Sequence, residues 1–353
     1  MAMTGALNGF SRQGSSPPRV SVIVPCYNER ATIGVLLEAL AEQDFPAEDM
    51  EVLVVDGRST DGTREVLAAY QRRVPYTLRV LDNPKRHIPA ALNLGIAHAR
   101  GQILIRLDAH SRPAPDYVTR CVETLHQVPR AGNVGGVWLI EPSRPDSWAS
   151  RSIAVAAAHP LGMGDSPYRC LNRPPGPVDT VPFGTFPREV FQRVGLFDET
   201  LLSNEDYEFN IRLRKAGYVV WLNPKIRCTY YARPTYGALA RQYARYGYWK
   251  AQVARRYPET LRWRQLVPPL YVFLALLWPV LGGLGWAWAW VLMVLQWGMY
   301  TFALALAGLG VAWRRRDPLL VMGVPLAMAI MHLIWGGAFW VGIVRRPKSW
   351  KTR

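Results

Sequence analysis

Short apolar runs alternate with amphipathic segments over the first third of the chain. The runs are rich in Val, Ile and Leu and have the length of buried strands, which we expect at 20–25, 51–55, 77–82 and 102–107. The intervening segments predict helices over about 29–43, 63–70 and 88–99, the first capped by Asn28. Strands that alternate with helices form a parallel sheet with right-handed crossovers, so the pattern predicts an α/β fold.

The pattern changes near the C-terminus. No residue from Leu266 to Trp313 is charged, and His332 is the only ionisable side chain from Pro318 to Val344. Roughly 20 apolar residues span a bilayer, and tryptophans flank these runs, which favours membrane segments over helices of a buried core. We expect three helices, over about 266–285, 287–311 and 319–343.

The charges at the ends of these segments conflict with three simple crossings. If the α/β domain is cytoplasmic, Arg314–Arg316 also lies inside, as the positive-inside rule requires. The basic tail from Arg345 would then lie outside. Either the third segment re-enters near Gly336–Gly337, or one segment lies in the membrane interface.

Composition narrows the class of partner. The net charge of +16 and the pI near 10.0 would suit nucleic acid, anionic lipid or a phosphorylated substrate. Because the chain carries membrane segments, lipid headgroups and substrate phosphates are favoured, and we expect no nucleic-acid partner. The four cysteines are scattered without a CxxC pair, as is typical of reduced thiols in a cytoplasmic domain.

Groups able to do chemistry follow the predicted strands. Asp108 and His110 come directly after the fourth strand, and side chains at i and i+2 share one face. They would project together at the carboxyl edge of the sheet, where open α/β sheets bind ligands. Asp56 ends the second strand, and we favour a ligand role for it, whereas Asp61 is better explained as a turn or helix cap.

Four motifs occur in an order and spacing that resemble the family-2 glycosyltransferases, across about residues 18–250. They are Pro25-Cys-Tyr-Asn-Glu29, Asp56-Gly-Arg-Ser-Thr-Asp-Gly-Thr63, Leu107-Asp-Ala-His110 and Asn204-Glu-Asp206. With the C-terminal apolar segments, the chain is most similar to the succinoglycan-type glucosyltransferases of exopolysaccharide assembly. The resemblance implies a GT-A fold, a mostly parallel Rossmann-like sheet domain, and inverting transfer of a hexose from a UDP-sugar.

The resemblance also implies a donor site. The turn with Pro25, Tyr27 and Glu29 would line the nucleoside, and Asp56 would accept a hydrogen bond from the uracil N3–H. Asp108 would reach the ribose or the metal. His110 would take the metal-ligand place of the usual Asp-x-Asp, holding Mg²⁺ or Mn²⁺, of which Mn²⁺ accepts imidazole more readily.

This chain departs from the family at Gly57, where a second acid is common. Lys85 and Arg86 could meet the phosphates or form a solvated basic turn.

For the acceptor side, the resemblance places the catalytic base at Asp206, paired with Glu205. A sugar hydroxyl attacks well only when its proton is removed, which is worth about 10²–10⁴-fold in rate. The alternative is a capping box formed by Ser203 and Asp206.

Further along, one helical face carries Gln242, Arg245 and Tyr246, which resemble the Gln-x-x-Arg-Trp motif and could steady a diphosphate and stack on sugar. The alternative is an amphipathic helix lying on lipid. Residues 141–185 are rich in Pro and Gly and are expected to form a loop that covers the acceptor and a β-segment that leads to Phe183-Gly184-Thr185.

The sequence therefore predicts a metal-dependent hexosyltransferase. It would be a multi-pass protein of the cytoplasmic membrane, with UDP-glucose as the expected donor and a polyprenyl-diphosphate-linked sugar as the acceptor at the cytoplasmic face. A polyprenyl-phosphate glycosyltransferase, a processive synthase and a non-catalytic nucleotide-sugar-binding subunit are the alternatives. The expected regions are a flexible tail (1–19), a GT-A catalytic domain (20–235), an amphipathic interfacial helix region (236–262), a transmembrane region (263–344) and a basic tail (345–353).

Overall fold

The computed structural model describes residues 17–164 and 166–345, so most of both predicted tails lies outside the described residues. Within this part a nine-stranded sheet has the order β3-β2-β1-β4-β8-β6-β9-β5, with β7 paired to β9. The predicted parallel half is confirmed, because β1 pairs in parallel with β2 and β4, and β2 with β3. These strands are β1 (Val20–Cys26), β2 (Met50–Asp56), β3 (Thr77–Asp82) and β4 (Ile103–Arg106).

The second half of the sheet is mixed. Its strands are β5 (Ser111–Pro113), β6 (Ala131–Pro142), β7 (Gly176–Pro177), β8 (Thr185–Pro187) and β9 (Val219–Ala232). Because β8 is antiparallel to both β4 and β6, the strands β4 and β6 point the same way, and β9 is parallel to β6. The carboxyl ends of β1, β2, β4, β6 and β9 therefore meet at one edge of the sheet.

Helices cover both faces of the sheet, which explains why its strands are so apolar. Alternate residues of β1 separate into two clusters: Val22 packs with Leu36 of α1 and Tyr117 of α4, and Ile23 packs with Leu92 of α3 and Phe209 of α8. The helices and short helical turns of this domain are α1 (Ile33–Ala41), η1 (Ala47–Asp49), α2 (Thr63–Tyr70), α3 (Ile88–His98), α4 (Tyr117–Gln127), α7 (Glu189–Val194) and α8 (Glu205–Lys215).

Two local predictions are wrong. Helix α1 begins at Ile33 rather than near 29, because Asn28 adopts a left-handed conformation (φ 54°) and its side chain accepts a hydrogen bond from Thr60 instead of capping the helix. The expected loop over 141–185 contains α5 (Trp148–Ala158), α6 (Pro160–Met163) and the turn η2 (Pro167–Arg169). Ser147 caps α5 by accepting from the Ser150 amide, and an alanine-rich run then forms the helix.

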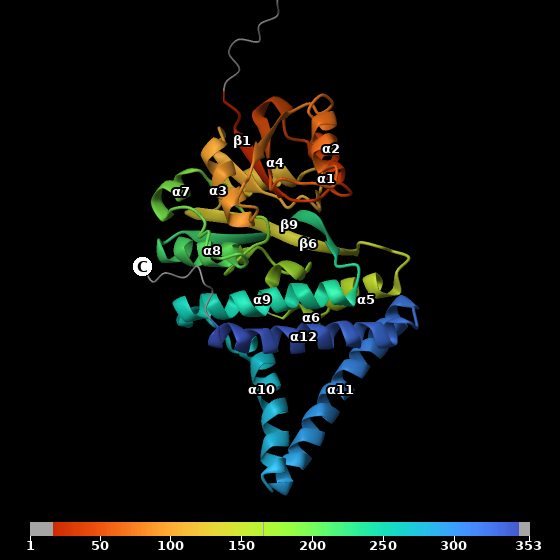
Figure 1. The fold of residues 1–353 in the computed structure, drawn as a ribbon. Coiled ribbons are helices and arrows are strands. Elements are labelled where there is room, and N and C mark those ends of the chain that lie inside the picture. Colours follow the sequence, from red (N-terminus) through yellow and green to blue (C-terminus); the bar gives the residue numbers. More distant parts are fainter. Residues whose placement is uncertain (1–16, 165, 346–353) are drawn as a thin grey trace, which may run out of the picture.

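Three C-terminal helices are long and apolar enough to cross a membrane, but they are not equivalent in the structure. Of the most apolar window of each, 6% is buried in α10, 11% in α11 and 33% in α12. Figure 1 shows α10 and α11 projecting from the domain as a V whose tip points away from the domain. Helix α12 lies across the open end of this V, beneath α9. The elements are α9 (Tyr236–Arg256), η3 (Pro258–Thr260), α10 (Trp263–Gly283), α11 (Ala287–Arg315) and α12 (Leu320–Val344).

Helix α12 is fastened to the catalytic part along its length. Trp148 donates to the Leu319 carbonyl at 2.7 Å, Tyr236 to Gly323 at 3.2 Å, and Gln252 to Gly342 at 2.7 Å. The approach is close: a Cβ on Gly342 would lie 2.5 Å from the Tyr248 carbonyl of α9. Helix α9, expected to lie on lipid, is thus covered by α12, and α12 has the outward position in this layer.

Candidate active site

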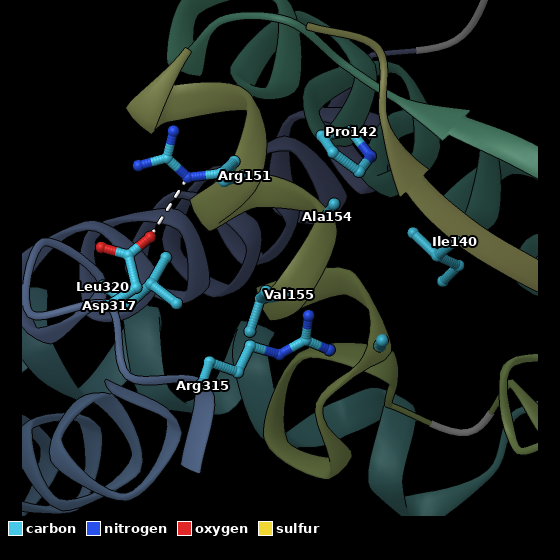
Figure 2. A pocket seen from close by; sticks show the side chains of 9 residues that line it. Ile140, Pro142, Arg151, Ala154, Val155, Arg315, Asp317 and Leu320 are labelled. Atoms are coloured by element: carbon cyan, nitrogen blue, oxygen red, sulfur yellow. Dashed lines mark hydrogen bonds and ion pairs between the residues drawn. The ribbon is translucent and has the colours of Figure 1, made fainter. Parts of the chain in front are cut away.

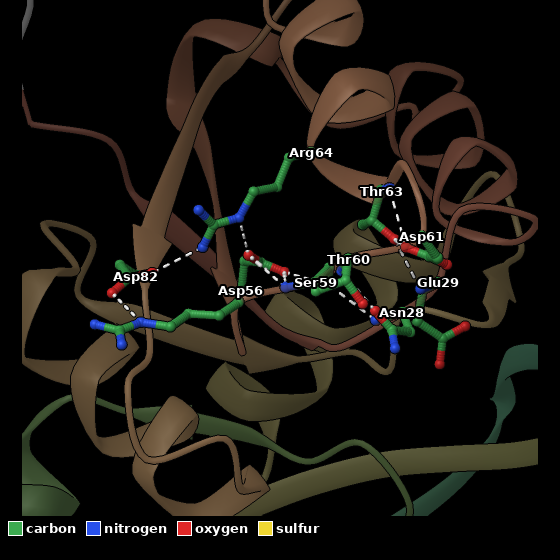
Figure 3. A network of polar contacts seen from close by, with 10 residues as sticks. Asn28, Glu29, Asp56, Ser59, Thr60, Asp61, Thr63, Arg64 and Asp82 are labelled. Atoms are coloured by element: carbon green, nitrogen blue, oxygen red, sulfur yellow. Dashed lines mark hydrogen bonds and ion pairs between the residues drawn. The ribbon is translucent and has the colours of Figure 1, made fainter.

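The turns that follow β1 and β2 are hydrogen-bonded to each other (Figure 3). The Asn28 amide donates to the Ser59 hydroxyl at 2.8 Å, and the Thr60 amide donates to the Asn28 side chain at 2.9 Å. The Glu29 amide donates to the Thr63 hydroxyl at 2.9 Å. The two motif segments, far apart in the sequence, therefore form one connected wall at the carboxyl edge of the sheet.

Asp56 lies at the centre of this wall and is fully buried. Its carboxylate accepts from the Ser59 hydroxyl at 2.5 Å and from the Arg64 guanidinium at 2.5 Å. Arg64 and Arg58 also bind Asp82, at 2.7 and 3.1 Å. A contact between Asp56 and a nucleobase stays a prediction, and it requires Arg64 to give up or share the carboxylate.

Tyr27 provides an exposed aromatic surface beside Asp56. Its side chain is 48% exposed, and its ring lies 3.2 Å from the point where a Cβ on Gly57 would stand. The missing side chain at Gly57 leaves room for the ring over the turn. Pro25 precedes it in β1, opposite Val55 of β2. Asp61 binds the turn as expected, accepting from the Thr63 amide and hydroxyl.

Asp108 and His110 follow β4, as predicted, and Glu29 joins them. The Glu29 carboxylate and the His110 Nδ1 atom are 3.0 Å apart, and each of the three side chains is about one quarter exposed (23–26%). Burial lowers the pKa of His110, but the hydrogen bond with Glu29 and the charges of Asp108 and Glu29 outweigh it and raise the pKa. Glu29 thus orients the imidazole ring.

Asp108 and His110 could supply only part of the ligand set of a divalent cation. Among residues 17–164 and 166–345, no group of three or more His, Cys, Asp or Glu side chains is arranged to bind a metal. The pair offers one carboxylate and one imidazole, a set that Mn²⁺ accepts and that suits Mg²⁺ less well. A cation held by this pair would need its remaining ligands from a bound phosphate and water.

Arg106 is the site residue that sequence reasoning missed. Its side chain is only 11% exposed, and it contacts Glu205 at 3.0 Å and Asp108 at 3.4 Å. It thereby joins the end of β4 to the start of α8, and its surroundings include the charge of Asp206. The one signal was a lone arginine inside the apolar run before Asp108.

The two acids of the Glu205-Asp206 pair have different environments. Burial raises the pKa of Glu205 to about 7, with the charges of Asp206 and Asp108 adding to the effect and that of Arg106 opposing it. Asp206 is only partly buried, and one of its oxygens accepts from the Tyr207 amide at 2.7 Å. The capping-box alternative is not formed, because α8 has Asn204 as its N-cap, in a left-handed conformation and without a side-chain cap.

Gln242, Arg245 and Tyr246 lie on one face of α9, and their role at the acceptor stays a prediction. Gln242 donates to the hydroxyls of Tyr246 at 2.9 Å and Tyr230 at 3.0 Å, and the exposed Arg245 lies over the Tyr246 ring. Lys85, by contrast, forms an ion pair with Glu199 at 2.6 Å.

One cavity of about 340 Å³ lies apart from these residues, between the end of β6, α5 and the α11–α12 junction (Figure 2). An ion pair of Arg151 and Asp317, 3.1 Å apart, closes one side of it. None of the predicted site residues lines this cavity.

Comparisons with known proteins agree with this geometry. The family model described as "Glycosyl transferase family 2" matches residues 21–195. The succinoglycan biosynthesis protein ExoA of Rhizobium meliloti is 32% identical over 90% of this chain and 93% of its own length. A dolichyl N-acetyl-α-D-glucosaminyl phosphate 3-β-D-2,3-diacetamido-2,3-dideoxy-β-D-glucuronosyltransferase of Methanococcus voltae is 26% identical over 94% of this chain and 99% of its own length.

A solved structure shows the same fold. The mannosyltransferase PcManGT of Pyrobaculum calidifontis, in complex with GDP-Man and Mn²⁺, superposes with a TM-score of 0.57 at 23% identity, covering 90% of this chain and 88% of that one. The predicted GT-A-like α/β domain with apolar C-terminal helices is thus confirmed. On the strength of the full-length match to ExoA and the family model, the chain belongs to glycosyl transferase family 2.

Proposed function

We propose that the chain is an inverting hexosyltransferase that uses a UDP-sugar, with UDP-glucose as the expected donor. The acceptor is a hydroxyl of a polyprenyl-diphosphate-linked sugar in polysaccharide assembly. The names of the relatives support this, one being a succinoglycan biosynthesis protein and another a transferase that acts on a dolichyl phosphate-linked sugar. The observation that carries the proposal is the contact of both Asp108 and Glu205 with the guanidinium of Arg106, within the electrostatic reach of Asp206.

Each acid has its own role in this proposal. Asp206, partly exposed at the start of α8, removes the proton of the acceptor hydroxyl as it attacks the anomeric carbon. Glu205 holds Arg106 in place and is a positioning residue. Asp108 and His110 hold a divalent cation, which when bound would neutralise the charge that develops on the leaving UDP.

The remaining predicted residues bind substrates. Pro25, Tyr27, Glu29 and Asp56 form the nucleoside wall. Gln242, Arg245 and Tyr246 face the acceptor or its diphosphate.

The membrane arrangement follows from the unequal helices. We place α10 and α11 across the cytoplasmic membrane as a hairpin, since 21 and 29 residues give about 31 and 44 Å of helix against a core of roughly 30 Å. Helix α12 lies in the interface, fastened to α9 and α5. Arg314–Arg316 and Arg345 then lie on the cytoplasmic side with the catalytic domain, which satisfies the positive-inside rule.

A polyprenyl phosphate acceptor is the second candidate, because relatives named undecaprenyl-phosphate 4-deoxy-4-formamido-L-arabinose transferase match 44% of the chain, at 32% identity in one case. Such an acceptor is already ionised and needs no general base, so Asp206 would have no role in activating it.

A transfer assay separates these proposals. The full chain, purified in detergent, is given UDP-glucose and either polyprenyl phosphate or a polyprenyl-diphosphate-linked sugar, with Mn²⁺ or Mg²⁺, and UDP release is measured. We expect release only with the glycosylated diphosphate acceptor and only with a divalent cation. Release with polyprenyl phosphate alone would contradict the acceptor assignment, and no release with any UDP-sugar and acceptor pair would favour a non-catalytic subunit.

A further inference from the structure

The half-buried Arg169 has no acidic partner among the described residues. Arg169, in η2, is enclosed by aromatic rings: its guanidinium is 5.7 Å from the centre of the Trp138 ring and 5.9 Å from that of Tyr168. Its hydrogen bond to the Tyr243 hydroxyl is long, at 3.3 Å. Within the described part of the chain, no carboxylate forms an ion pair with it.

Two N–H groups in this aromatic box lack an acceptor. The Nε atom of Arg169 and the Nε1 atom of Trp138 are both buried, and neither has a hydrogen-bond partner among the described residues. An unpaired buried donor destabilises the folded chain, and a charged one does so more strongly. Both donors need an acceptor, and the charge of the guanidinium, which lies over the Trp138 ring, favours an anionic one.

The aromatic box is joined through Tyr230 to the strand that follows His110. The rings of Trp138 and Tyr230 stack at 4.2 Å, nearly parallel, and Gln242 holds Tyr230 through a hydrogen bond. In the pairing of β5 with β9, Tyr230 lies opposite Ser111, the residue that follows His110. Tyr230 thus connects the box to the strand that begins directly after His110, a residue that the proposed function places at the cation of the diphosphate.

We propose that Arg169 and Trp138 form an oxyanion site for a phosphate group of a diphosphate substrate. This rests on the proposed function, in which both the sugar nucleotide and the lipid-linked acceptor carry a diphosphate. Arginine suits such a site better than lysine, because its guanidinium stacks on aromatic rings and offers a planar set of donors to phosphate oxygens. The bound phosphate gives both buried donors their acceptor and neutralises the enclosed charge.

Equilibrium binding to the full chain in detergent tests this site without requiring turnover. The probes are inorganic pyrophosphate, UDP and polyprenyl diphosphate, and the variants are Arg169→Gln and Trp138→Phe, which keeps the ring but removes its N–H. Arg173→Gln, an exposed arginine of the same segment, is the matched control. We expect Arg169→Gln to weaken pyrophosphate binding about tenfold or more and Trp138→Phe to weaken it severalfold, with the control unchanged.

The probes distinguish the two possible sources of the phosphate. If the donor supplies it, UDP binding weakens in Arg169→Gln and polyprenyl diphosphate binding does not. If the acceptor supplies it, the reverse holds. Unchanged affinity for all three probes in both variants, as would be found if a buried water filled the box, would overturn the proposal.

Should Arg169→Gln fail to fold, Trp138→Phe alone decides. A chain that binds pyrophosphate through Arg169 but releases no UDP in the transfer assay would overturn the transferase proposal and leave this site standing.

Discussion

Arg106 and Glu205 form an enclosed ion pair, with Nη1 and Oε1 3.0 Å apart and side chains only 11% and 5% exposed. The pair joins the last residue of β4 to the first residue of α8, and so fixes the distance between the Asp108 region and Asp206. A buried pair of this kind leaves little freedom for Glu205 to exchange protons with a substrate. This supports the proposal that Asp206, and not Glu205, is the general base.

The first prediction concerns the general base. Asp206→Asn should lower the turnover number about 10²–10⁴-fold, because the acceptor hydroxyl keeps its proton, while UDP affinity and thermal stability stay near wild type. Steady-state transfer measures the turnover number, calorimetric titration measures the UDP affinity, and thermal unfolding measures the stability. Glu205→Gln provides the contrast: it removes one partner of a buried pair and should cost about 3 kcal/mol of unfolding free energy. Near-normal turnover in Asp206→Asn would contradict the mechanism.

The second prediction concerns the choice of cation. His110→Asp replaces imidazole nitrogen by carboxylate oxygen, so activity with Mg²⁺ should rise relative to activity with Mn²⁺. The ratio of the two rates at saturating metal is the measurement, and chelation by EDTA should abolish transfer in both proteins. An unchanged Mg²⁺ to Mn²⁺ ratio would show that His110 is not a ligand.

The third prediction concerns base recognition. Uracil presents an N3–H donor and cytosine an N3 acceptor at the same place, so a carboxylate at Asp56 should favour UDP over CDP. Asp56→Asn should reduce the ratio of the dissociation constant of CDP to that of UDP about tenfold, since a charge-assisted hydrogen bond is lost. Arg64→Gln, which removes the competing partner of the carboxylate, should leave UDP binding equal or tighter. A UDP to CDP preference that persists in Asp56→Asn would exclude Asp56 as the base contact.

The parts that the sequence could predict are those set by local pattern. The strands β1 to β4 lie within one residue of their expected bounds because each is an apolar run of the right length. The orientation of α12 could not be predicted, because this helix is as long and as apolar as one that spans a membrane. Three hydrogen bonds that hold it against the catalytic part come from Trp148, Tyr236 and Gln252, which precede α12 in the sequence by 68 residues or more.

The same reason explains what was missed in the site. The roles of Arg106 and Arg169 depend on contacts with residues distant in the sequence, such as Glu205 and Trp138, which the local sequence does not indicate. Helix α5 did carry a local signal, Ser147 before an alanine-rich run, which the surrounding prolines and glycines obscured.

The fourth prediction follows from the position of α12. With α12 in the interface, single cysteines at Arg314 and at Arg345 should react with a membrane-impermeant maleimide from the same side. A cysteine at Leu284, at the tip of the α10–α11 hairpin, should react from the other side. Inverted and right-side-out vesicles give the two sides. Labelling of positions 314 and 345 from opposite sides would show that α12 crosses the membrane.

The fifth prediction concerns acid stability. Glu51 is fully buried and accepts from Ser21, Arg79 and Arg100; burial raises its pKa, but these hydrogen bonds and the Arg100 charge outweigh it and lower the pKa below its usual value of 4.5. A depressed pKa contributes stability that is present above pH 4.5 and is lost as the pH falls through the folded value. Thermal unfolding from pH 7 to pH 3 should show this loss, and Glu51→Gln should be destabilised at pH 7 and less sensitive to acid.

Glu29 belongs to two parts of the site at once. Its amide binds Thr63 in the wall around Asp56, and its carboxylate binds His110. If the nucleotide binds as proposed, a base that displaces this wall also shifts the His110 imidazole. Because Glu29 contacts both parts, the identity of the base can affect the rate of sugar transfer as well as the affinity for the nucleotide.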